Sequence, residues 1–316
     1  MTLQELRERQ SWSLEQKIDH SLGTIEAFVS RMGGVDKVYV AFSGGKDSTV
    51  LLDLCHKVYP NILAVFCNTG NEYPDIVRFV RQKIAAGENI QIIRPKMTPR
   101  EVWAKYGFPL VSKESSEHIH DIRINPQSKT ARRKLTGDFS LPIKWRYLIY
   151  EPYDTTHYCC KILKKNPSHD YQKQSGRFQI IGTMASESQL REKSYIRYGG
   201  CNVFGKRPTS RPLSIWCDED IWTYIRRFDI SIADIYYKGA KRTGCMGCGF
   251  GAQFTGDPRF RTLLREYPKC YDMVMNYTNN GVTFREALRK VLAVNKLYLP
   301  DEQPPTLFDE FNTKAI

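Results

Sequence analysis

The chain has 316 residues, of which 41% are hydrophobic, and a formal net charge of +13. This length accommodates one large domain, or one domain with a smaller C-terminal lobe, and the composition excludes global disorder. Neither a long apolar run nor the apolar stretch of a signal peptide occurs, so we expect no membrane span and a cytoplasmic location. The positive charge favours an acidic partner such as a nucleotide or nucleic acid.

The N-terminal part of the chain alternates helical and buried-strand patterns. Apolar residues recur at helical spacing from Ser13 to Met32, and Gly33-Gly34 ends that helix. Further patterns predict strands over 38–42, 62–67 and 90–93, and helices over 49–59 and 74–86. This alternation predicts an α/β fold in which a doubly wound parallel sheet is covered by helices on both faces.

The pattern weakens between residues 113 and 150, where basic residues accumulate. This stretch is either a solvated insertion, such as a helix pair, or a face that binds a polyanion. Its basic residues are Lys113, Arg123, Lys129, Arg132, Arg133, Lys134, Lys144 and Arg146. A strand over 179–182 and helices over 218–228, 259–267 and 283–297 follow. We therefore expect an N-terminal helix in 1–34, a nucleotide-binding domain in 35–250 with the basic insertion at 113–150, and a helical C-terminal extension in 251–316.

The first expected strand ends in Ser43-Gly44-Gly45-Lys46-Asp47-Ser48 and leads into a helix. Two glycines let the backbone approach a ligand closely, and the amides at a helix N-terminus attract phosphate. Lys46 adds positive charge, Ser43 and Ser48 add hydroxyl donors, and Asp47 is placed to help hold a Mg²⁺ ion that bridges phosphates. The spacing differs from that of the P-loop of kinases and GTPases. The segment therefore predicts an adenine-nucleotide site, with a simple glycine turn as the alternative.

This loop resembles the PP-loop of the adenine nucleotide alpha-hydrolase superfamily, the ATP pyrophosphatases. Asn68-Thr69-Gly70-Asn71-Glu72-Tyr73-Pro74 resembles a segment that frames the nucleotide in phosphoadenosine phosphosulfate (PAPS) reductases. The segment from Gly182 to Ser188, with Arg191, is similar to another family segment, although Met184 stands where an arginine is usual. Residues 211–225 resemble a further segment of the same family. The resemblance implies a Rossmann-like fold and adds nucleotide contacts to those of the loop, at Asn68, Thr69, Gly70, Gly182, Glu187, Ser188 and Arg191.

Four cysteines form the second strong pattern, Cys159-Cys160 and Cys245-Met246-Gly247-Cys248. A Cys-x-x-Cys turn can aim both thiolates at one centre, and two such pairs supply four sulfurs. Tetrahedral zinc and a [4Fe-4S] cluster both need four ligands, so the residues alone leave these alternatives open. The flanking Gly244 and Gly247 would let the backbone fold tightly around either centre.

The cysteine pattern also resembles that of cluster-bearing adenylylsulfate reductases, which use a Cys-Cys pair and a distant Cys-x-x-Cys to bind [4Fe-4S]. In those proteins the pair is followed by a lysine and then a proline, at the positions of Lys164 and Pro167 here. The resemblance thus implies a [4Fe-4S] cluster on Cys159, Cys160, Cys245 and Cys248, with zinc as the alternative. It places Lys164 close to the cluster and the nucleotide, as a residue that offsets thiolate charge.

Two departures from the reductases shape the functional expectation. Reductases of the family carry a degenerate phosphate loop, whereas Ser43–Ser48 is intact, as in members that split ATP into AMP and diphosphate. They also end in a cysteine-bearing tail, and this sequence has no cysteine after Cys270. We therefore expect ATP-dependent adenylation coupled to sulfur transfer, with Lys46, Asp47 and Lys164 as catalytic residues. The relatives that act in DNA phosphorothioation and tRNA thiolation suggest a nucleic acid substrate, and a cysteine desulfurase is a candidate sulfur donor.

Two alternatives stay open at this point. The chain could reduce adenylylsulfate or phosphoadenylylsulfate to sulfite, with the thiol of Cys270 or of a partner replacing that of the tail. It could instead be the nucleotide-sensing subunit of a defence or modification complex, with little turnover of its own.

Overall fold

The computed structural model describes residues 1–255 and 257–302, so the C-terminal sequence from Gln303 lies outside the described residues. The chain divides into two compact units that are interleaved along the sequence. The first unit comprises Met1–Asn68, Tyr73–Pro95 and Asn166–Tyr236. The second comprises Thr69–Glu72, Lys96–Lys165 and the described residues from Tyr237 onward.

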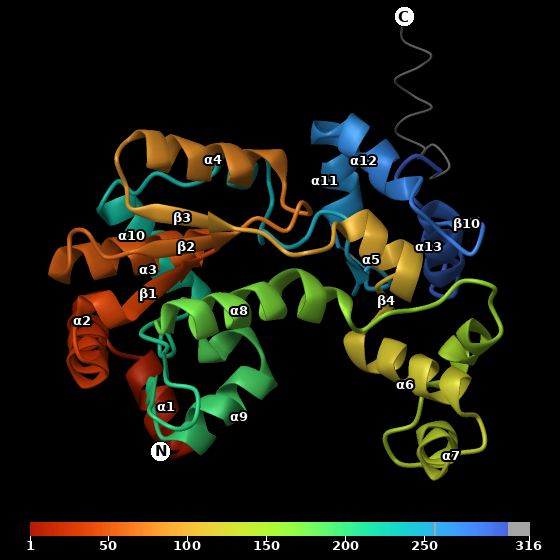
Figure 1. Ribbon diagram of the computed structural model, residues 1–316, viewed down its shortest axis with the longest axis horizontal. Coiled ribbons are helices and arrows are strands. Elements are labelled where there is room, and N and C mark those ends of the chain that lie inside the picture. The colour runs from red at the N-terminus through yellow and green to blue at the C-terminus, as the bar shows by residue number, and fades with distance from the viewer. Residues whose placement is uncertain (256, 303–316) are drawn as a thin grey trace, which may run out of the picture. The chain divides into compact units, whose positions relative to one another are not determined.

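The first unit is built on a six-stranded sheet of order β3-β2-β1-β5-β7-β6, with helices around it (Figure 1). All neighbouring strands run parallel except β6, which pairs with β7 antiparallel. The strands are β1 (Val38–Phe42), β2 (Ala64–Cys67), β3 (Ile90–Ile93), β5 (Phe178–Ile181), β6 (Asn202–Val203) and β7 (Thr209–Ser210). The helices are α1 (Leu3–Gln10), α2 (Leu14–Met32), α3 (Lys46–Val58), α4 (Pro74–Ala85), α8 (Asn166–Ser175), α9 (Gln189–Tyr198) and α10 (Asp218–Arg227). Shorter 3₁₀ turns are η1 (Val35–Lys37), η4 (Ala185–Glu187) and η5 (Asp234–Tyr236).

Both faces of this sheet are buried, as the apolar strand sequences predict. Successive side chains of a strand point to opposite faces. Tyr39 and Val65 pack with Tyr171 of α8 on one face, while Val40 and Phe66 are buried on the other. The predicted α/β fold with a doubly wound, mostly parallel sheet is therefore confirmed.

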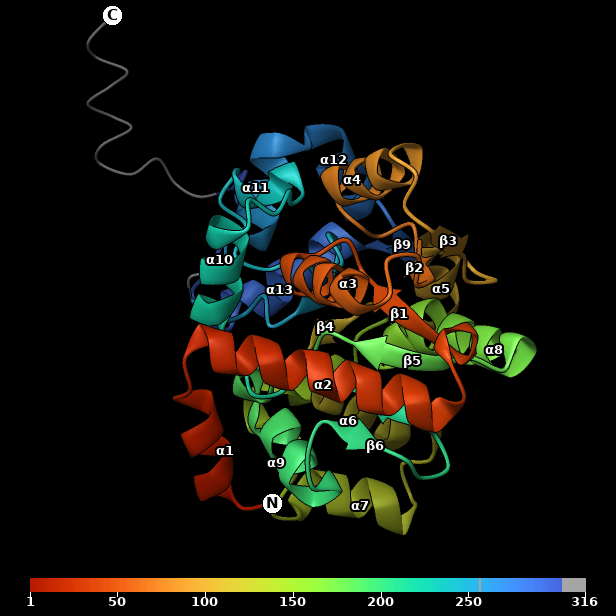
Figure 2. The same cartoon turned by 90° about the vertical axis from the view of Figure 1, so that its left-hand side faces the viewer.

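The N-terminal segment contains one helix more than the sequence predicted. Ser13 caps the expected helix α2, with a capping box that includes Gln16. Before it, α1 has its own capping box, formed by Thr2 and Glu5. Figure 2 shows both helices in red. A mostly polar segment thus forms a helix with one buried anchor, Leu6.

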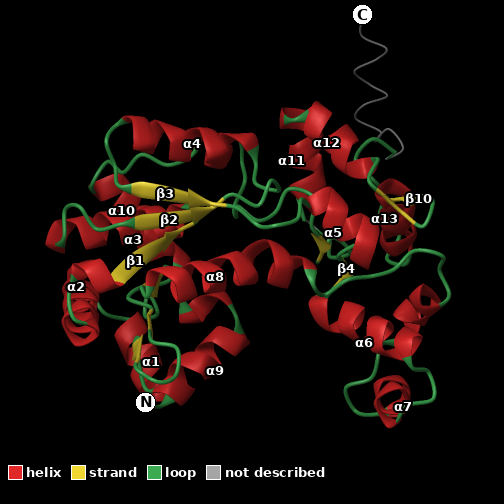
Figure 3. Ribbon diagram, in the orientation of Figure 1, coloured by secondary structure: helices red, strands yellow, loops and turns green. Residues whose placement is uncertain are grey.

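The second unit is mainly helical (Figure 3). Its helices are α5 (Pro99–Tyr106), α6 (Lys113–Ile124), α7 (Lys129–Thr136), α11 (Arg259–Glu266), α12 (Pro268–Met275) and α13 (Phe284–Ala293). It also contains the 3₁₀ segment η2 (Ile143–Ile149) and the π-helical turn η3 (Lys161–Lys165). Two short strand pairs are β4 (Leu110–Val111) with β8 (Gly249–Phe250), and β9 (Thr278–Asn279) with β10 (Val282–Thr283).

The core of the second unit is aromatic. Trp103, Phe108 and Phe284 are fully buried and lie in ring contact with one another. No helix in the described part of the chain is long and apolar enough to cross a membrane.

Candidate nucleotide and cysteine sites

The predicted phosphate loop joins β1 to α3 in the first unit. Gly44 adopts a left-handed conformation with φ of 72°, and α3 begins at Lys46, so Lys46 to Ser48 form its first turn. The Ser48 hydroxyl lies 3.0 Å from that of Ser43 and accepts from the Ser43 backbone N–H at 3.1 Å. The Ser43 hydroxyl also accepts from the Gly45 N–H at 3.3 Å. The two serines therefore shape the loop from inside, while the start of α3 supplies the partial positive charge that attracts phosphate.

The loop tolerates no side chain at Gly44. A Cβ there would lie 2.8 Å from Cγ2 of Ile76 and 3.1 Å from Cγ2 of Val80, both on α4. The neighbouring predicted residue Gly182, which follows β5, lies against the same helix start, since its Cβ would be 3.1 Å from the Asp47 carbonyl oxygen. Close packing and the positive φ at Gly44 together explain why this loop needs glycine.

Lys46 is the buried charge of the loop. Only 2% of its side chain is exposed, and its ammonium lies 2.7 Å from a carboxylate oxygen of Asp47 and 2.5 Å from one of Asp218. Burial alone would lower the pKa of Lys46, but the two carboxylates outweigh it and raise the pKa, so the group stays charged. Its backbone N–H donates to the Tyr236 hydroxyl at 2.8 Å, and its ammonium lies 5.7 Å from the centre of the Trp222 ring.

The predicted residues after Gly182 interact mainly with one another. Glu187 forms an ion pair with Arg191 and accepts from the Met184 backbone N–H at 2.9 Å. The Ser188 hydroxyl caps α9 by accepting from the Arg191 N–H. Met184 is buried at 2% exposure, so this position contributes packing in the first unit. Asn68 follows β2 and its backbone N–H donates to the Ile93 carbonyl.

The predicted residues Thr69 and Gly70 belong to the second unit, in a short loop with Asn71 and Glu72. Thr69 donates to Glu72 through its backbone N–H at 2.9 Å and its hydroxyl at 2.6 Å. Asn71 contacts the Cys-x-x-Cys turn directly. Its carbonyl accepts from the Met246 N–H at 2.8 Å, and its side-chain oxygen accepts from the Gly247 N–H at 3.1 Å. This loop therefore holds the cysteine turn in place.

The second unit brings the two cysteine pairs into one region. Cys159 and Cys160 directly precede the π-helical turn η3, which carries Lys164, and Cys245 and Cys248 flank a tight turn closed by a 3.2 Å hydrogen bond. Gly247 lies at the back of this turn, because a Cβ there would be 2.7 Å from Val274 and 2.9 Å from Trp103. Gly244 has nothing within 4 Å of such a Cβ, so only one of the two expected glycines is required by packing.

The thiols influence one another and the basic groups beside them. Burial raises the pKa of Cys159 to about 12, the neighbouring Trp103 indole opposes the rise, and the thiols of Cys245, Cys160 and Cys248 add to it. Burial also raises the pKa of Cys248 to about 11, whereas Arg259 lowers it. Cys245 raises the pKa of Lys164 and outweighs burial, so this ammonium stays charged next to the thiols.

The residues present fit a sulfur-ligated metal group by their chemistry. All four thiols are buried or half-buried. Lys164 lies near Cys245 and Cys160, and Arg259 lies near Cys248, so these two cations would offset the negative charge of thiolate ligands. Trp103 Nε1 is buried and has no hydrogen-bond partner among the described residues, so its N–H is a donor that the sulfur of a bound group could use. As placed, no three His, Cys, Asp or Glu side chains of the described residues stand close enough to hold a single ion.

The basic stretch forms α6, α7 and η2, and its charges divide into two sets. Arg123, Lys134 and Arg146 are used internally: Arg123 bonds the Tyr153 carbonyl, Lys134 pairs with Asp121 at 2.6 Å, and Arg146 bonds the carbonyls of Leu135 and Leu141. The other set is exposed and comprises Lys113, Lys129, Arg132, Arg133 and Lys144. The sequence could not separate these two sets.

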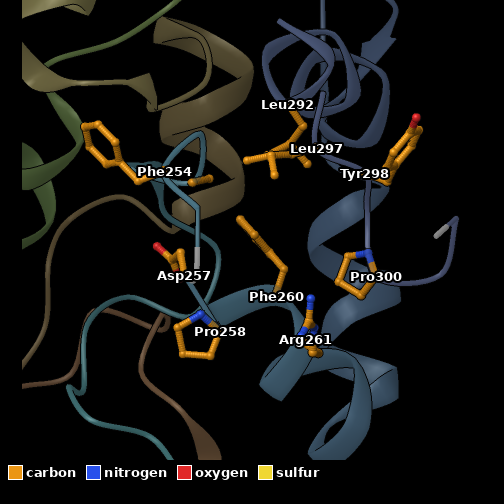
Figure 4. A pocket seen from close by; sticks show the side chains of 10 residues that line it. Phe254, Asp257, Pro258, Phe260, Arg261, Leu292, Leu297, Tyr298 and Pro300 are labelled. Atoms are coloured by element: carbon orange, nitrogen blue, oxygen red, sulfur yellow. The ribbon is translucent and has the colours of Figure 1, made fainter. Parts of the chain in front are cut away.

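A small pocket of the same unit lies beside α11 and α13 (Figure 4). Phe254, Phe260 and Leu297 contribute apolar walls, while Asp257 and Arg261 add charges. Its volume is about 120 Å³, below the roughly 300–1,000 Å³ of typical small-molecule sites. We assign it no ligand.

Several residues of these sites escaped the sequence analysis. Tyr236 and Trp222 contact Lys46, and Trp103 and Arg259 lie with the cysteines. None belongs to a local motif, so only the three-dimensional structure identifies them. The acidic start of α10 at Asp218 was visible as a helix signal, but its contact with Lys46 was not.

The fold and the loop define an α/β protein with a PP-loop. Comparison with known proteins gives the family, since residues 37–249 match the phosphoadenosine phosphosulfate reductase domain. The chain belongs to this family, as its motifs predicted.

Individual relatives are distant. The chain is 28% identical over 220 residues to an uncharacterized protein of Methanocaldococcus jannaschii, a match that covers 67% of this chain and 41% of that protein. It is 23% identical over 239 residues to adenosine 5'-phosphosulfate reductase 2 of Bacillus subtilis, covering 74% of this chain and 82% of the relative. A solved PAPS reductase from Candida auris, in a phosphate complex, is 18% identical with a TM-score of 0.42, covering 74% of this chain and 96% of that one.

Proposed function

We propose that this chain is an ATP-dependent adenylating sulfurtransferase that acts on nucleic acid and carries a [4Fe-4S] cluster on Cys159, Cys160, Cys245 and Cys248. The observation that carries the proposal is the pairing, in one chain, of an intact phosphate loop around a buried charged lysine with a gathering of four thiols. A loop with both glycines and Lys46 suits the β- and γ-phosphates of ATP, whereas a nucleotide that lacks them would leave the Lys46 ammonium with Asp47 and Asp218 as its only charged partners among the described residues.

The first step is adenylation. An oxygen of the acceptor base attacks the α-phosphorus of ATP, the bond to the β,γ-diphosphate breaks, and diphosphate leaves with Mg²⁺. Lys46 and the start of α3 would stabilise the departing diphosphate, and Asp47 would help hold the ion. Residues of the second segment, Glu187, Ser188 and Arg191, and of the loop Asn68–Gly70 are the proposed further nucleotide contacts.

The second step exchanges oxygen for sulfur. Hydrosulfide, supplied by a donor such as a cysteine desulfurase with a reductant, attacks the activated carbon, and the oxygen leaves with AMP. A cluster bound at the four cysteines would supply electron transfer. Lys164 stays charged beside Cys245 and would balance the negative charge of the thiolates. Zinc is the alternative occupant, and iron and zinc analysis of anaerobically purified protein separates the two.

The test is exchange of labelled diphosphate into ATP, with purified protein and single-stranded or transfer RNA as acceptor. We expect exchange that depends on Mg²⁺ and disappears in Lys46→Met. Absence of exchange with every acceptor tried would overturn adenylation. Retention of exchange in a Cys245→Ser variant, with loss of thiolated product, would assign the cysteines to the second step.

A second function is supported by the relatives, several of which are named adenosine 5'-phosphosulfate reductases. In this case a thiolate would attack the sulfur of adenylylsulfate and AMP would leave, which gives an S-sulfonated thiol. A second thiol would then displace sulfite, and the two thiols would end as a disulfide. Cys270 on α12 is half-buried, which leaves it accessible for this role. Sulfite release with thioredoxin would support reduction, and unchanged release by Cys270→Ser would remove Cys270 from it.

A further inference from the structure

A second cavity of the helical unit lies within the basic stretch. It has a volume of about 510 Å³, within the roughly 300–1,000 Å³ of small-molecule sites. Its walls come from α6, the segment between α7 and η2, and the chain after β8. Neither the phosphate loop nor the four cysteines line it.

Two phenylalanines line this cavity while exposing most of their surface. Phe139 is 84% exposed and Phe254 67% exposed. Aromatic rings left in water at the mouth of a cavity are well suited to stack on a flat heterocycle. Trp145 completes the aromatic lining from a buried position.

Gln253 provides the polar group inside. It lines the cavity, is only 5% exposed, and its side-chain oxygen is buried with no hydrogen-bond partner among the described residues. A buried amide oxygen without a partner costs about 1–3 kcal/mol, so such a group signals an absent donor. That oxygen is closed to water in this structure, so the Gln253 side chain must rotate toward the cavity before a ring or exocyclic N–H of a nucleobase can donate to it.

The backbone beside Gln253 is also held in a costly conformation. Val111, a β-branched residue, has φ of 62° and lines the same cavity, and its carbonyl accepts from the Gly251 N–H at 2.8 Å. Such strain persists only where the surroundings fix it, and it is concentrated at binding sites.

Charge decides which part of a nucleotide would enter. The cavity lining includes two carboxylates, Glu114 and Asp138, and one ammonium, Lys144. Its charge is therefore not positive enough to favour a phosphate inside. Outside it, α7 exposes Lys129, Arg132 and Arg133, none of which makes an ion pair within residues 1–255 and 257–302. A neutral base inside with the backbone phosphates along α7 satisfies both surfaces.

We propose that this cavity binds one unpaired base of single-stranded nucleic acid, stacked on Phe139 and Phe254 and hydrogen-bonded to Gln253. The proposal rests on the proposed function for its choice of partner, and it identifies where the acceptor strand is held. It does not depend on ATP or on a metal group.

The test is fluorescence anisotropy with labelled single-stranded RNA and DNA and with matched abasic strands, in buffer without ATP. We expect abasic strands to bind at least about fivefold more weakly, and Phe139→Ala to lose roughly tenfold in affinity for base-bearing strands, as for loss of one stacking contact. Tyr237→Ala is the matched control, because Tyr237 is 75% exposed in the same unit and lies outside the cavity lining.

Gln253→Met separates ligand binding from folding. If the amide oxygen serves a ligand, this variant melts at or above the wild-type temperature yet binds base-bearing strands several-fold more weakly. A lower melting temperature with unchanged binding would show a structural glutamine and overturn its role. Equal binding of abasic and base-bearing strands would contradict the proposal that this cavity binds a base. Mononucleotides that bind as tightly as strands would contradict the proposal that the ligand is a strand.

These outcomes are distinguishable from failure of the proposed function. Diphosphate exchange with base-independent strand binding would remove the pocket and leave adenylation standing. Base-dependent binding without exchange would support the pocket and remove adenylation.

Discussion

The two sides of the Lys46 ion pairs should contribute unequally to the free energy of unfolding. Lys46 is 2% exposed, whereas the side chains of Asp47 and Asp218 are 29% and 66% exposed. Lys46→Met removes the buried charge and leaves two carboxylates that water can solvate, so we expect a loss of about 1 kcal/mol or less in unfolding free energy. The double variant Asp47→Asn with Asp218→Asn leaves the ammonium buried without a counter-ion, which we expect to cost about 3–5 kcal/mol.

Urea denaturation of the three proteins measures these differences, and calorimetry measures ATP binding. Loss of a hydrogen bond from a charged group costs about 1.5–3 kcal/mol, so Lys46→Met should bind ATP roughly ten- to a hundredfold more weakly while remaining folded. The single Asp218→Asn variant should lie close to wild type in stability because Asp47 remains. Should Lys46→Met prove less stable than the double variant, the lysine is a structural ion-pair partner and our reasoning fails.

Three further predictions concern glycines and the loop that holds the cysteine turn. Gly44→Ala should be destabilised by about 1–3 kcal/mol more than Gly33→Ala, because both have positive φ but only Gly44 also meets α4; equal urea midpoints would contradict this. Gly247→Ala should lose bound iron and unfold at a lower urea concentration, because its Cβ would overlap Trp103. Gly244→Ala should match wild type in iron content, because, apart from its chain neighbours, no atom of the described residues lies within 4 Å of its Cβ. Asn71→Leu should cost about 1–3 kcal/mol in urea denaturation by leaving the Gly247 N–H unsatisfied, and a wild-type midpoint would show that water replaces the amide.

The sequence predicted the parts of the structure that local signals encode. The strand, the glycine pair and the helix around Gly44 follow one another directly, so their order alone gives the loop. The helix start was placed three residues late, at Thr49, because a helix capped by Gly45 offers no side-chain capping signal. Helix α1 was missed even though its capping box is visible at Thr2 and Glu5, since its buried face consists of one leucine.

Long-range partners could not be predicted in this way. Tyr236 belongs to no recognisable sequence motif, yet its hydroxyl accepts a hydrogen bond from the backbone N–H of Lys46, which lies 190 residues away in the chain. Asn71 was read as part of a nucleotide segment, and it also fixes the Cys-x-x-Cys turn 176 residues away. The basic stretch shows the same limit, because the internal use of Arg123 and the exposure of Arg132 depend on packing that composition does not encode.

Family membership leaves the choice between adenylation and sulfonucleotide reduction to the ligand, and Lys46 offers a way to decide it. ATP presents a β,γ-diphosphate to the loop, whereas adenylylsulfate presents a single phosphate and a sulfate. If the loop serves ATP, wild-type protein should prefer ATP. Lys46→Met should weaken ATP binding much more than adenylylsulfate binding, because the β,γ-diphosphate brings more negative charge to the buried ammonium than the single sulfate does. A wild-type preference for adenylylsulfate that survives in Lys46→Met would place the recognised charge elsewhere and favour the reductase. Competition calorimetry of the two ligands measures both preferences in one titration series, independently of turnover, sulfur donor or acceptor.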